Sequence, residues 1–303
     1  MEQPTLIFDV KRYAINDGPG IRITIFLKGC SLDCKWCHNP ESIPRKQQKM
    51  YSNDKCISSG ECVKNCPNDA LTLTPDGIVT NADLCAMCGK CADVCPTKAM
   101  EMTGQLMTTD EVMTQIKKET ILMDTSEGGV TFSGGEPLLH HKFLIEMLDA
   151  CGKEGIHRCI DTTGLANSNI LMEVAGKAEH FLYDLKLMDS AKHKEWTGVP
   201  NEKILENLKL LAASGMNMNI RIPLIKGVND DDENIYESAK FIATLEGKKP
   251  LVNILPFHNI AAKKYEKLGV HYEKGIMDEP SIERQKRVLD IFEEHGVNAM
   301  IGG

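Results

Sequence analysis

Apolar and polar residues follow one another along most of the chain in an order that predicts alternating strands and helices. Short apolar runs predict six buried strands, at 21–27, 130–132, 157–160, 181–187, 218–225 and 251–257. Amphipathic segments predict helices at about 109–123, 141–154, 203–214, 234–245 and 281–295. This α/β repeat implies a parallel sheet, with ligand sites at the carboxyl ends of the strands.

Between about residues 47 and 104 this pattern stops. Lys46–Tyr51 is polar and without periodicity, which predicts a linker, and a short hairpin is expected around Pro75-Asp76-Gly77. Seven cysteines lie in this stretch. We therefore expect two units: one built from residues 1–46 and 105–303, and an insert of residues 47–104.

Composition narrows the class of protein. The net charge of −8 argues against nucleic acid as a main partner. Glu2 and Asp9 lie where a signal peptide would be basic and then apolar, and no apolar run approaches the roughly 20 residues of a membrane span. Most of the twelve cysteines are closely spaced, which favours metal binding in a reducing cytoplasm over disulfides. Cys151 and Cys159 lack ligand spacing and are expected to be buried thiols.

Cys30, Cys34 and Cys37 follow the first predicted strand at the spacing C-x3-C-x2-C. A [4Fe–4S] cluster held by protein alone takes four thiolates, so three leave one iron open to another ligand. The alternatives are a structural zinc site or a coincidence of cysteines. Zinc sites usually use pairs of ligands two to four residues apart, and no second pair follows nearby. The spacing therefore favours an iron–sulfur cluster.

This loop, with Trp36 before its last cysteine, resembles the signature of the radical S-adenosylmethionine (SAM) enzymes. The flanking stretches DGPGIR at 17–22 and CHNPE at 37–41 resemble the glycyl-radical-enzyme activating enzymes, such as that of pyruvate formate-lyase. The resemblance covers nearly the whole chain. It implies a partial (β/α)6 TIM-type barrel, and a cluster whose open iron is chelated by the amino and carboxylate groups of SAM.

The resemblance also implies roles for residues at the predicted strand ends. Gly134, Gly135 and Glu136 match the motif that holds the SAM amino group, and Glu136 and backbone acceptors can bind an ammonium. Asp161 and Asp184 are expected near the SAM carboxylate, in some relatives through a monovalent cation. The remaining expected contacts are Lys186 beside the sulfonium, Arg221 as a carboxylate partner or a strand-end salt bridge, and His258, Trp36 and His38 near the adenosine.

The insert carries two groups of cysteines. Cys85, Cys88, Cys91 and Cys95-Pro96 form the run C-x2-C-x2-C-x3-C-P of two-cluster ferredoxins, in which the fourth cysteine ligates the other cluster. We therefore expect a ferredoxin-like insert with one [4Fe–4S] site on Cys66, Cys85, Cys88 and Cys91. The second site would use Cys56, Cys62 and Cys95, with Ser59 in place of a thiolate. It could hold a three-iron cluster, a cubane with a serine or solvent ligand, or no stable cluster.

Three functions fit these features. The favoured one is an activase that cleaves SAM reductively and abstracts hydrogen from a glycine of a partner glycyl radical enzyme, with a flavodoxin- or ferredoxin-type protein as reductant. The insert makes the chain resemble activases of glycerol or diol dehydratases, choline lyase or aryl-substrate enzymes. The alternatives are a radical SAM enzyme acting on a small molecule or another peptide, and an electron carrier with the barrel as scaffold.

Overall fold

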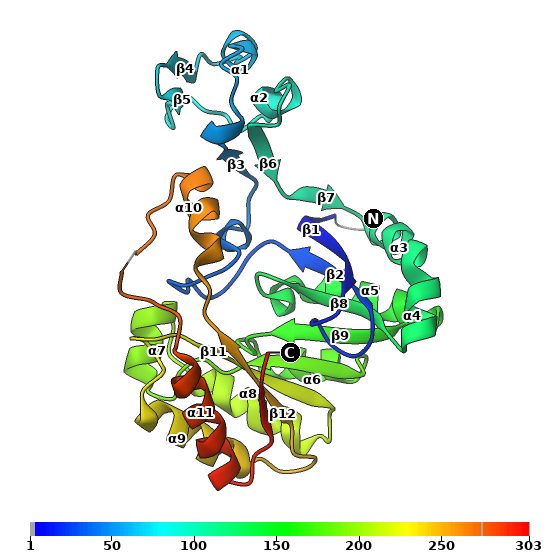
Figure 1. Cartoon of the computed structure of the whole chain (residues 1–303). Coiled ribbons are helices and arrows are strands. Elements are labelled where there is room, and N and C mark those ends of the chain that lie inside the picture. Colours follow the sequence, from blue (N-terminus) through cyan, green and yellow to red (C-terminus); the bar gives the residue numbers. More distant parts are fainter. Residues whose placement is uncertain (1–3, 274, 303) are drawn as a thin grey trace.

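The computed structural model describes residues 4–273 and 275–302, and a nine-stranded sheet lies at its centre (Figure 1). Seven of the strands are adjacent and parallel: β2 (Arg22–Leu27), β8 (Gly129–Gly134), β9 (His157–Thr162), β10 (His180–Asp184), β11 (Met218–Leu224), β12 (Leu251–Pro256) and β13 (Ala299–Ile301). The first six are the strands that the sequence predicts. The predicted α/β class with a large parallel sheet is therefore confirmed.

Two further strands extend one edge of the sheet in the antiparallel sense. These are β1 (Thr5–Ala14), which pairs with β2, and β7 (Gln105–Met107), which pairs with β1. Neither was predicted. The second half of β1 is largely exposed, so it lacks the apolar alternation that marks a buried strand.

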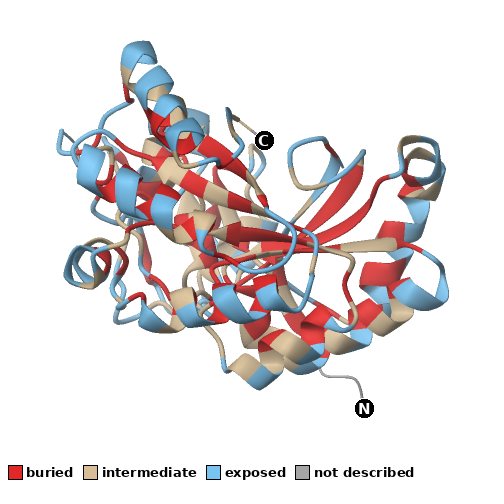
Figure 2. Ribbon diagram, turned by 90° about the horizontal axis from the view of Figure 1, so that it is seen from below, coloured by how far each residue is buried: buried red, intermediate tan, exposed pale blue. Residues whose placement is uncertain are grey.

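The predicted helices at 141–154, 203–214, 234–245 and 281–295 are present as α5 (His141–Lys153), α8 (Glu202–Ala213), α9 (Asp232–Ala243) and α11 (Ile282–Glu294). Outside the segment 48–103, three short helices of the described residues were not predicted: α6 (Ser168–Ala175), α7 (Ser190–Thr197) and α10 (Ala262–Leu268). Figure 2 shows the buried residues on the strands and on the inner sides of the helices. No helix within the described residues is long and apolar enough to cross a membrane.

The single helix predicted over 109–123 is wrong in its continuity. The chain forms α3 (Thr109–Ile116) and α4 (Thr120–Ser126), separated by a 3-10 turn at Lys117–Glu119. Glu119 is buried and lies 3.2 Å from Arg12 of β1. We attribute the break to this ion pair, which holds Glu119 against the sheet edge at a backbone conformation outside the helical region (φ −107°, ψ 4°).

The two faces of the sheet differ in chemistry. Ile23, Ile25 and Phe132 belong to the main apolar core with the helices. Alternate residues point to the opposite face, which carries polar side chains from the same strands, including Thr24 and Thr131. That face therefore carries polar side chains in place of the apolar core.

Residues 48–103 form a cysteine-rich lobe that projects from the sheet (Figure 1). Its elements are β3 (Gln48–Tyr51), α1 (Glu61–Lys64), β4 (Leu71–Thr74), β5 (Gly77–Thr80), α2 (Lys90–Asp93) and β6 (Met100–Thr103). β3 pairs with β6 and β4 with β5, both antiparallel. The predicted hairpin at 75–77 is present, but the predicted linker at 46–51 is wrong for 48–51, because cross-strand pairing with β6 orders β3.

Lys28 joins the lobe to the sheet. Its side chain is fully buried just after β2. Its ammonium donates to the backbone oxygen of Glu41, to Thr103 Oγ1 at 3.0 Å and to Gln48 Oε1 at 3.3 Å. Burial lowers the pKa of Lys28 to about 8, against the opposing charge of Glu41. One cation thus connects both base strands of the lobe to the chain just after the cysteine loop.

Candidate active site

The loop with Cys30, Cys34 and Cys37 leaves the carboxyl end of β2. Burial raises the pKa of the Cys30 thiol to about 12 and that of Cys37 to about 11, and it raises the pKa of Cys34 further. Each thiol interacts electrostatically with at least one of the others, and the charge of Lys186 favours the thiolate of all three. Three soft donors therefore converge near one cation.

The three loop thiols are not gathered around a single point. Within the part of the chain that the structure describes, no three Cys, His, Asp or Glu side chains approach closely enough to hold one metal ion. A cubane takes each thiolate on a different iron and so needs them apart. Binding of iron would release the protons of the buried thiols to solvent, and Lys186 would offset part of the resulting negative charge.

The helix α10 supports this loop from outside. Tyr265 donates a hydrogen bond to the backbone oxygen of Cys37 at 3.1 Å. Lys264 donates to Asn39 Oδ1 and Glu41 Oε1, both at 2.6 Å. These supporting residues were missed because neither α10 nor any spacing in 259–273 marks them in the sequence.

The glycine turn after β8 lies directly against the cysteine loop. Gly134 has φ +117°, and a Cβ there would overlap the backbone of Leu27. A Cβ at Gly135 would overlap the carbonyl oxygen of Gly29. Both positions therefore require glycine. The close approach places the backbone of the turn beside the start of the cysteine loop.

Glu136 is fully buried, and its carboxylate is already saturated. Oε1 accepts from Thr162 Oγ1 at 2.6 Å and from the Leu138 nitrogen at 3.1 Å. Oε2 accepts from the nitrogen and hydroxyl of Thr163 at 2.9 and 2.6 Å. Burial raises the pKa of Glu136, and these hydrogen bonds oppose the rise. The side chain thus fixes the glycine turn to the end of β9 and keeps no free acceptor of its own.

Asp161, Asp184, Lys186 and Arg221 meet at the ends of β9, β10 and β11. Lys186 Nζ lies 2.8 Å from Asp184 Oδ2, and Arg221 Nη1 lies 3.2 Å from Asp161 Oδ2. Ser133 Oγ donates to the same Asp161 oxygen at 2.6 Å. Burial disfavours the charge on Lys186, but Asp184 and the thiols of the cysteine loop outweigh it and raise its pKa.

Arg221 retains an unused donor in this network. Its Nη1 is buried and makes no hydrogen bond of good geometry, although Asp161 lies within ion-pair distance. Its Nε is 3.9 Å from Asp184 Oδ1. Both carboxylates raise the pKa of Arg221 and outweigh its burial. A ligand carboxylate placed here would satisfy the free donor.

The three residues expected near adenosine lie around the loop in different environments. Trp36 is buried in an apolar cluster, with its ring centroid 6.4 Å from that of Trp196. The His38 ring is 6.0 Å from that of Phe257, and burial lowers its pKa. His258 is more exposed, with Nδ1 3.3 Å from Glu279. The buried Trp36 ring is thus used for packing, whereas His258 can still reach a ligand.

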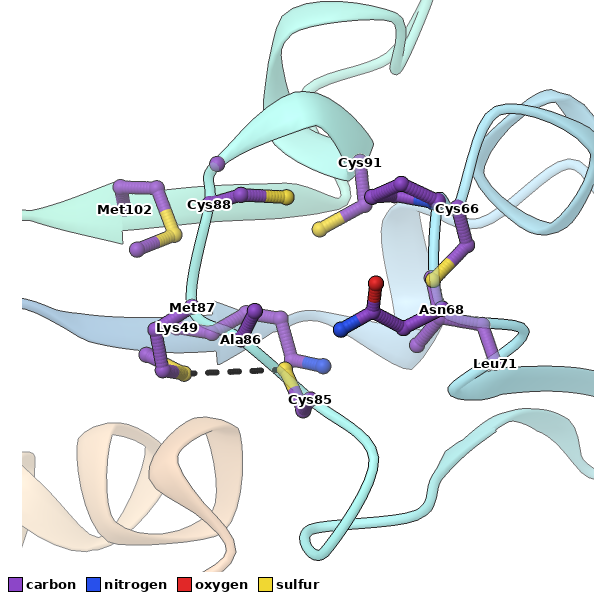
Figure 3. Close-up of a pocket in the computed structure, with 12 residues that line it drawn as sticks. Lys49, Cys66, Asn68, Leu71, Cys85, Ala86, Met87, Cys88, Cys91 and Met102 are labelled. Atoms are coloured by element: carbon purple, nitrogen blue, oxygen red, sulfur yellow. Dashed lines mark hydrogen bonds between the residues drawn. The ribbon is translucent and has the colours of Figure 1, made fainter.

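The cysteine-rich lobe contains two cavities. The first, of about 380 Å³ and open to solvent, is lined by Cys66, Cys85, Cys88 and Cys91, the four residues predicted to act together (Figure 3). Cys66 follows α1, Cys85 and Cys88 lie in the loop before α2, and Cys91 lies in α2. The residues present fit a four-thiolate cluster.

The second cavity, of about 320 Å³, is lined by Cys56, Cys62, Cys95 and Ser59. Cys95 comes from the half of the lobe that supplies three cysteines to the first cavity. The structure thus brings together both crossed sets that the sequence predicts. Tyr51, which no cysteine spacing indicates, also lines this cavity.

Comparison with known proteins identifies relatives of this chain. A family profile described as a 4Fe-4S single cluster domain matches residues 16–205. The chain is 43% identical to the trans-4-hydroxy-L-proline dehydratase activating enzyme of Clostridioides difficile, over 98% of this chain and 99% of the relative. It is 38% identical to the choline trimethylamine-lyase activating enzyme of Oleidesulfovibrio alaskensis, over 90% and 89%.

Among solved structures, the chain resembles a domain of pyruvate-formate lyase-activating enzyme from Bacteroides vulgatus. The TM-score is 0.51 and the identity 44%, over 58% of this chain and 99% of that domain. The three-cysteine loop, the strand-end motifs and these relatives all indicate one type of chemistry. The chain belongs to the glycyl-radical-enzyme activating enzymes, which are radical SAM oxidoreductases.

Proposed function

We propose that this chain uses a [4Fe–4S] cluster on Cys30, Cys34 and Cys37, together with SAM, to place a radical on a glycine of a partner enzyme. When bound, the cluster supplies the electron that splits SAM into methionine and a 5′-deoxyadenosyl radical, which takes hydrogen from the glycine Cα. Glycine suits this step because no side chain blocks its Cα. The protein residues bind SAM and the partner and orient them for this transfer.

The strand ends supply the contacts for SAM. We assign the SAM carboxylate to Arg221, because its Nη1 is a buried donor without a hydrogen bond. The ammonium would bind backbone oxygens of the turn at Gly134 and Gly135, because the Glu136 carboxylate is saturated. Asp161 and Asp184 could share a monovalent cation, and Lys186 would offset negative charge at the three thiolates.

The adenosine would lie between the cysteine loop and the end of β12. His38 and His258 are the side chains proposed to contact it, with Trp36 acting through its backbone because its ring is packed away. No side chain is required as an acid or base. Orientation and exclusion of water are the contributions that this site makes to the reaction.

We propose that residues 1–46 and 105–303 form a partial (β/α)6 barrel and that residues 47–104 form a ferredoxin-like domain. The lobe would hold a [4Fe–4S] cluster on Cys66, Cys85, Cys88 and Cys91, and a second cluster on Cys56, Cys62 and Cys95. The crossing of Cys66 and Cys95 between the two cavities supports this assignment. A flavodoxin- or ferredoxin-type protein would reduce these clusters in a reducing cytoplasm.

The observation that carries the proposal is the meeting of two features at one edge of the sheet. Lys186 favours the thiolate form of all three loop cysteines, and it lies in one ion-pair network with Arg221 and its unused donor. A cluster site and a carboxylate site are thus adjacent, as chelation of SAM to an open iron requires. An electron carrier would need only the first.

The loop at 17–20 is the part of the site that we propose contacts a peptide substrate. Arg22 donates to the Pro19 oxygen at 2.7 Å, and Thr131 donates to the Asp17 oxygen at 2.6 Å, so the loop is fixed over the polar face of the sheet. We propose that this loop forms one wall of a groove for an extended glycine segment. Holding such a segment costs about 1–2 kcal/mol per residue, so the groove must supply several contacts.

The test uses anaerobic, dithionite-reduced protein, SAM and a short peptide copied from a glycyl radical loop with deuterium on the glycine Cα. We expect the peptide to stimulate 5′-deoxyadenosine formation and deuterium to appear in that product. The same peptide with alanine for glycine is the control and should give much less. Turnover on a small molecule with no deuterium transfer from several such loops would favour the second class of radical SAM enzyme.

A further inference from the structure

The lobe is an internal repeat whose two halves match residue by residue. β3, α1 and β4 recur at one constant offset as β5, α2 and β6. The left-handed residues Ser58, Gly60 and Asp69 recur at the same offset as Met87, Gly89 and Lys98. The two halves therefore share the same order of elements and of left-handed positions, so the side chains that line the two cavities can be compared pair by pair.

Two substitutions within the repeat make the cavities chemically unequal. Cys88 of the first cavity corresponds to Ser59 of the second. Lys49 of the first cavity corresponds to Ile78 of the second, which is buried. Among the described residues that line the two cavities, Lys49 is the only one with a charged side chain.

The Lys49 side chain is held in position. Lys49 lies in β3, where it pairs with Met102 of β6, another residue that lines the same cavity. Its Nζ donates to Thr80 Oγ1 at 2.6 Å. Its charge acts on Cys91, where it favours the thiolate and opposes the effect of burial. Figure 3 shows Lys49 with the cysteines around the cavity.

We propose that Lys49 is a cofactor-tuning residue that raises the reduction potential of the cluster held by Cys66, Cys85, Cys88 and Cys91. The inference rests on the proposed auxiliary clusters. Reduction adds one negative charge to a cluster whose thiolates already make it anionic, and a fixed cation stabilises the reduced state more than the oxidised one. The second cavity lacks this cation, so an added electron would reside preferentially in the first.

The experiment measures the midpoint potential of the lobe clusters by an EPR-monitored redox titration. Cys34→Ala protein is used throughout, so that signals from the cysteine loop do not interfere. Lys49→Ile copies the residue of the other half of the repeat, and Lys49→Gln keeps a donor for Thr80 without the charge. Lys49→Arg preserves the charge, and Lys90→Met removes an exposed lysine next to Cys91 as the matched control.

We expect a shift to more negative potential in Lys49→Ile and Lys49→Gln, and little shift in Lys49→Arg or Lys90→Met. A potential equal to that of the parent in an iron-loaded Lys49→Ile or Lys49→Gln protein would overturn the tuning role. An equal shift in Lys90→Met would also overturn it, because general surface charge would then explain the effect. Iron content separates these results from a failure of the cluster assignment, in which the parent itself would bind no iron in the lobe.

Discussion

Thr163 donates two hydrogen bonds to one oxygen of Glu136, from its backbone nitrogen at 2.9 Å and from its hydroxyl at 2.6 Å. Thr162 and the Leu138 nitrogen occupy the other oxygen. A carboxylate accepts about four hydrogen bonds, so Glu136 has no capacity left for a ligand. Its role is to hold the ends of β8 and β9 together beside the proposed SAM site.

We expect Glu136→Ala to weaken SAM binding by at least about tenfold and to lower the melting temperature. The substitution leaves buried donors of Thr162 and Thr163 without acceptors, at a cost of about 1–3 kcal/mol for each group. Glu237→Ala, on the exposed side of α9, is the control and should change neither quantity. Titration with SAM and thermal unfolding measure both effects. Unchanged SAM affinity in Glu136→Ala would contradict this role.

Asp161 should make SAM binding sensitive to mildly acidic pH. Burial raises its pKa to about 6, Asp184 adds to the rise, and Arg221 opposes it. Below that pH the carboxylate gains a proton and can no longer share the proposed monovalent cation with Asp184. A single titrating group loses its ionised form about tenfold per pH unit below its pKa, so SAM affinity should fall with up to that slope. Asp161→Asn should bind weakly with a flat profile between pH 5 and pH 7.

The same pKa predicts the sign of a stability effect. Because the folded-state pKa of Asp161 lies above its ordinary value, the neutral form favours folding, and this contribution is lost as pH rises through about 6. Asp161→Asn should therefore gain stability relative to wild type between about pH 4 and pH 7. If the difference in free energy of unfolding between wild type and Asp161→Asn does not change with pH over this range, burial does not dominate the pKa of this carboxylate.

Cys34→Ala should abolish SAM cleavage and leave the clusters of the cysteine-rich lobe in place. Three thiolates are the minimum for a cluster with one open iron, and the lobe draws its ligands from other residues. Iron content should fall by about four atoms per chain. Cys151→Ala removes a fully buried thiol of the main core and should keep both iron and activity. Full 5′-deoxyadenosine formation by the Cys34 variant is the result that rules this assignment out.

The sequence was sufficient for features with a short-range signal. Apolar runs predicted the six parallel strands, and the cysteine spacing at 85–95 predicted that Cys66 would lie together with Cys85, Cys88 and Cys91. Contacts between distant segments left no such signal. In the sequence, Lys28 is only a polar residue after a predicted strand, but in the structure its side chain joins three segments of the chain. Glu136 was expected to bind a ligand, and only the fold shows that Thr162 and Thr163 saturate it.

The repeat in the lobe lies between these cases. Its constant offset is present in the sequence, in Cys56 and Cys85 and in Gly60 and Gly89. The difference between Lys49 and Ile78 becomes informative only in the structure, which places each residue beside a different cavity. Pairing of β3 with β6 produces that placement, and the polar stretch that contains β3 resembled a linker.

Ser59→Cys should make the two cavities of the lobe more alike. Ser59 lines the second cavity at the position that Cys88 occupies in the first, so a thiol there completes a set with Cys56, Cys62 and Cys95. A thiolate is a softer ligand than a hydroxyl and binds iron of a cluster more strongly. We expect the variant to bind more iron and to give a more uniform [4Fe–4S] spectrum by Mössbauer and EPR spectroscopy.

Ser58→Cys is the matched control, because Ser58 is adjacent in sequence but does not line the cavity. Its iron content should equal that of wild type. Two indistinguishable four-iron clusters in the wild-type lobe would show that Ser59 does not limit the second site.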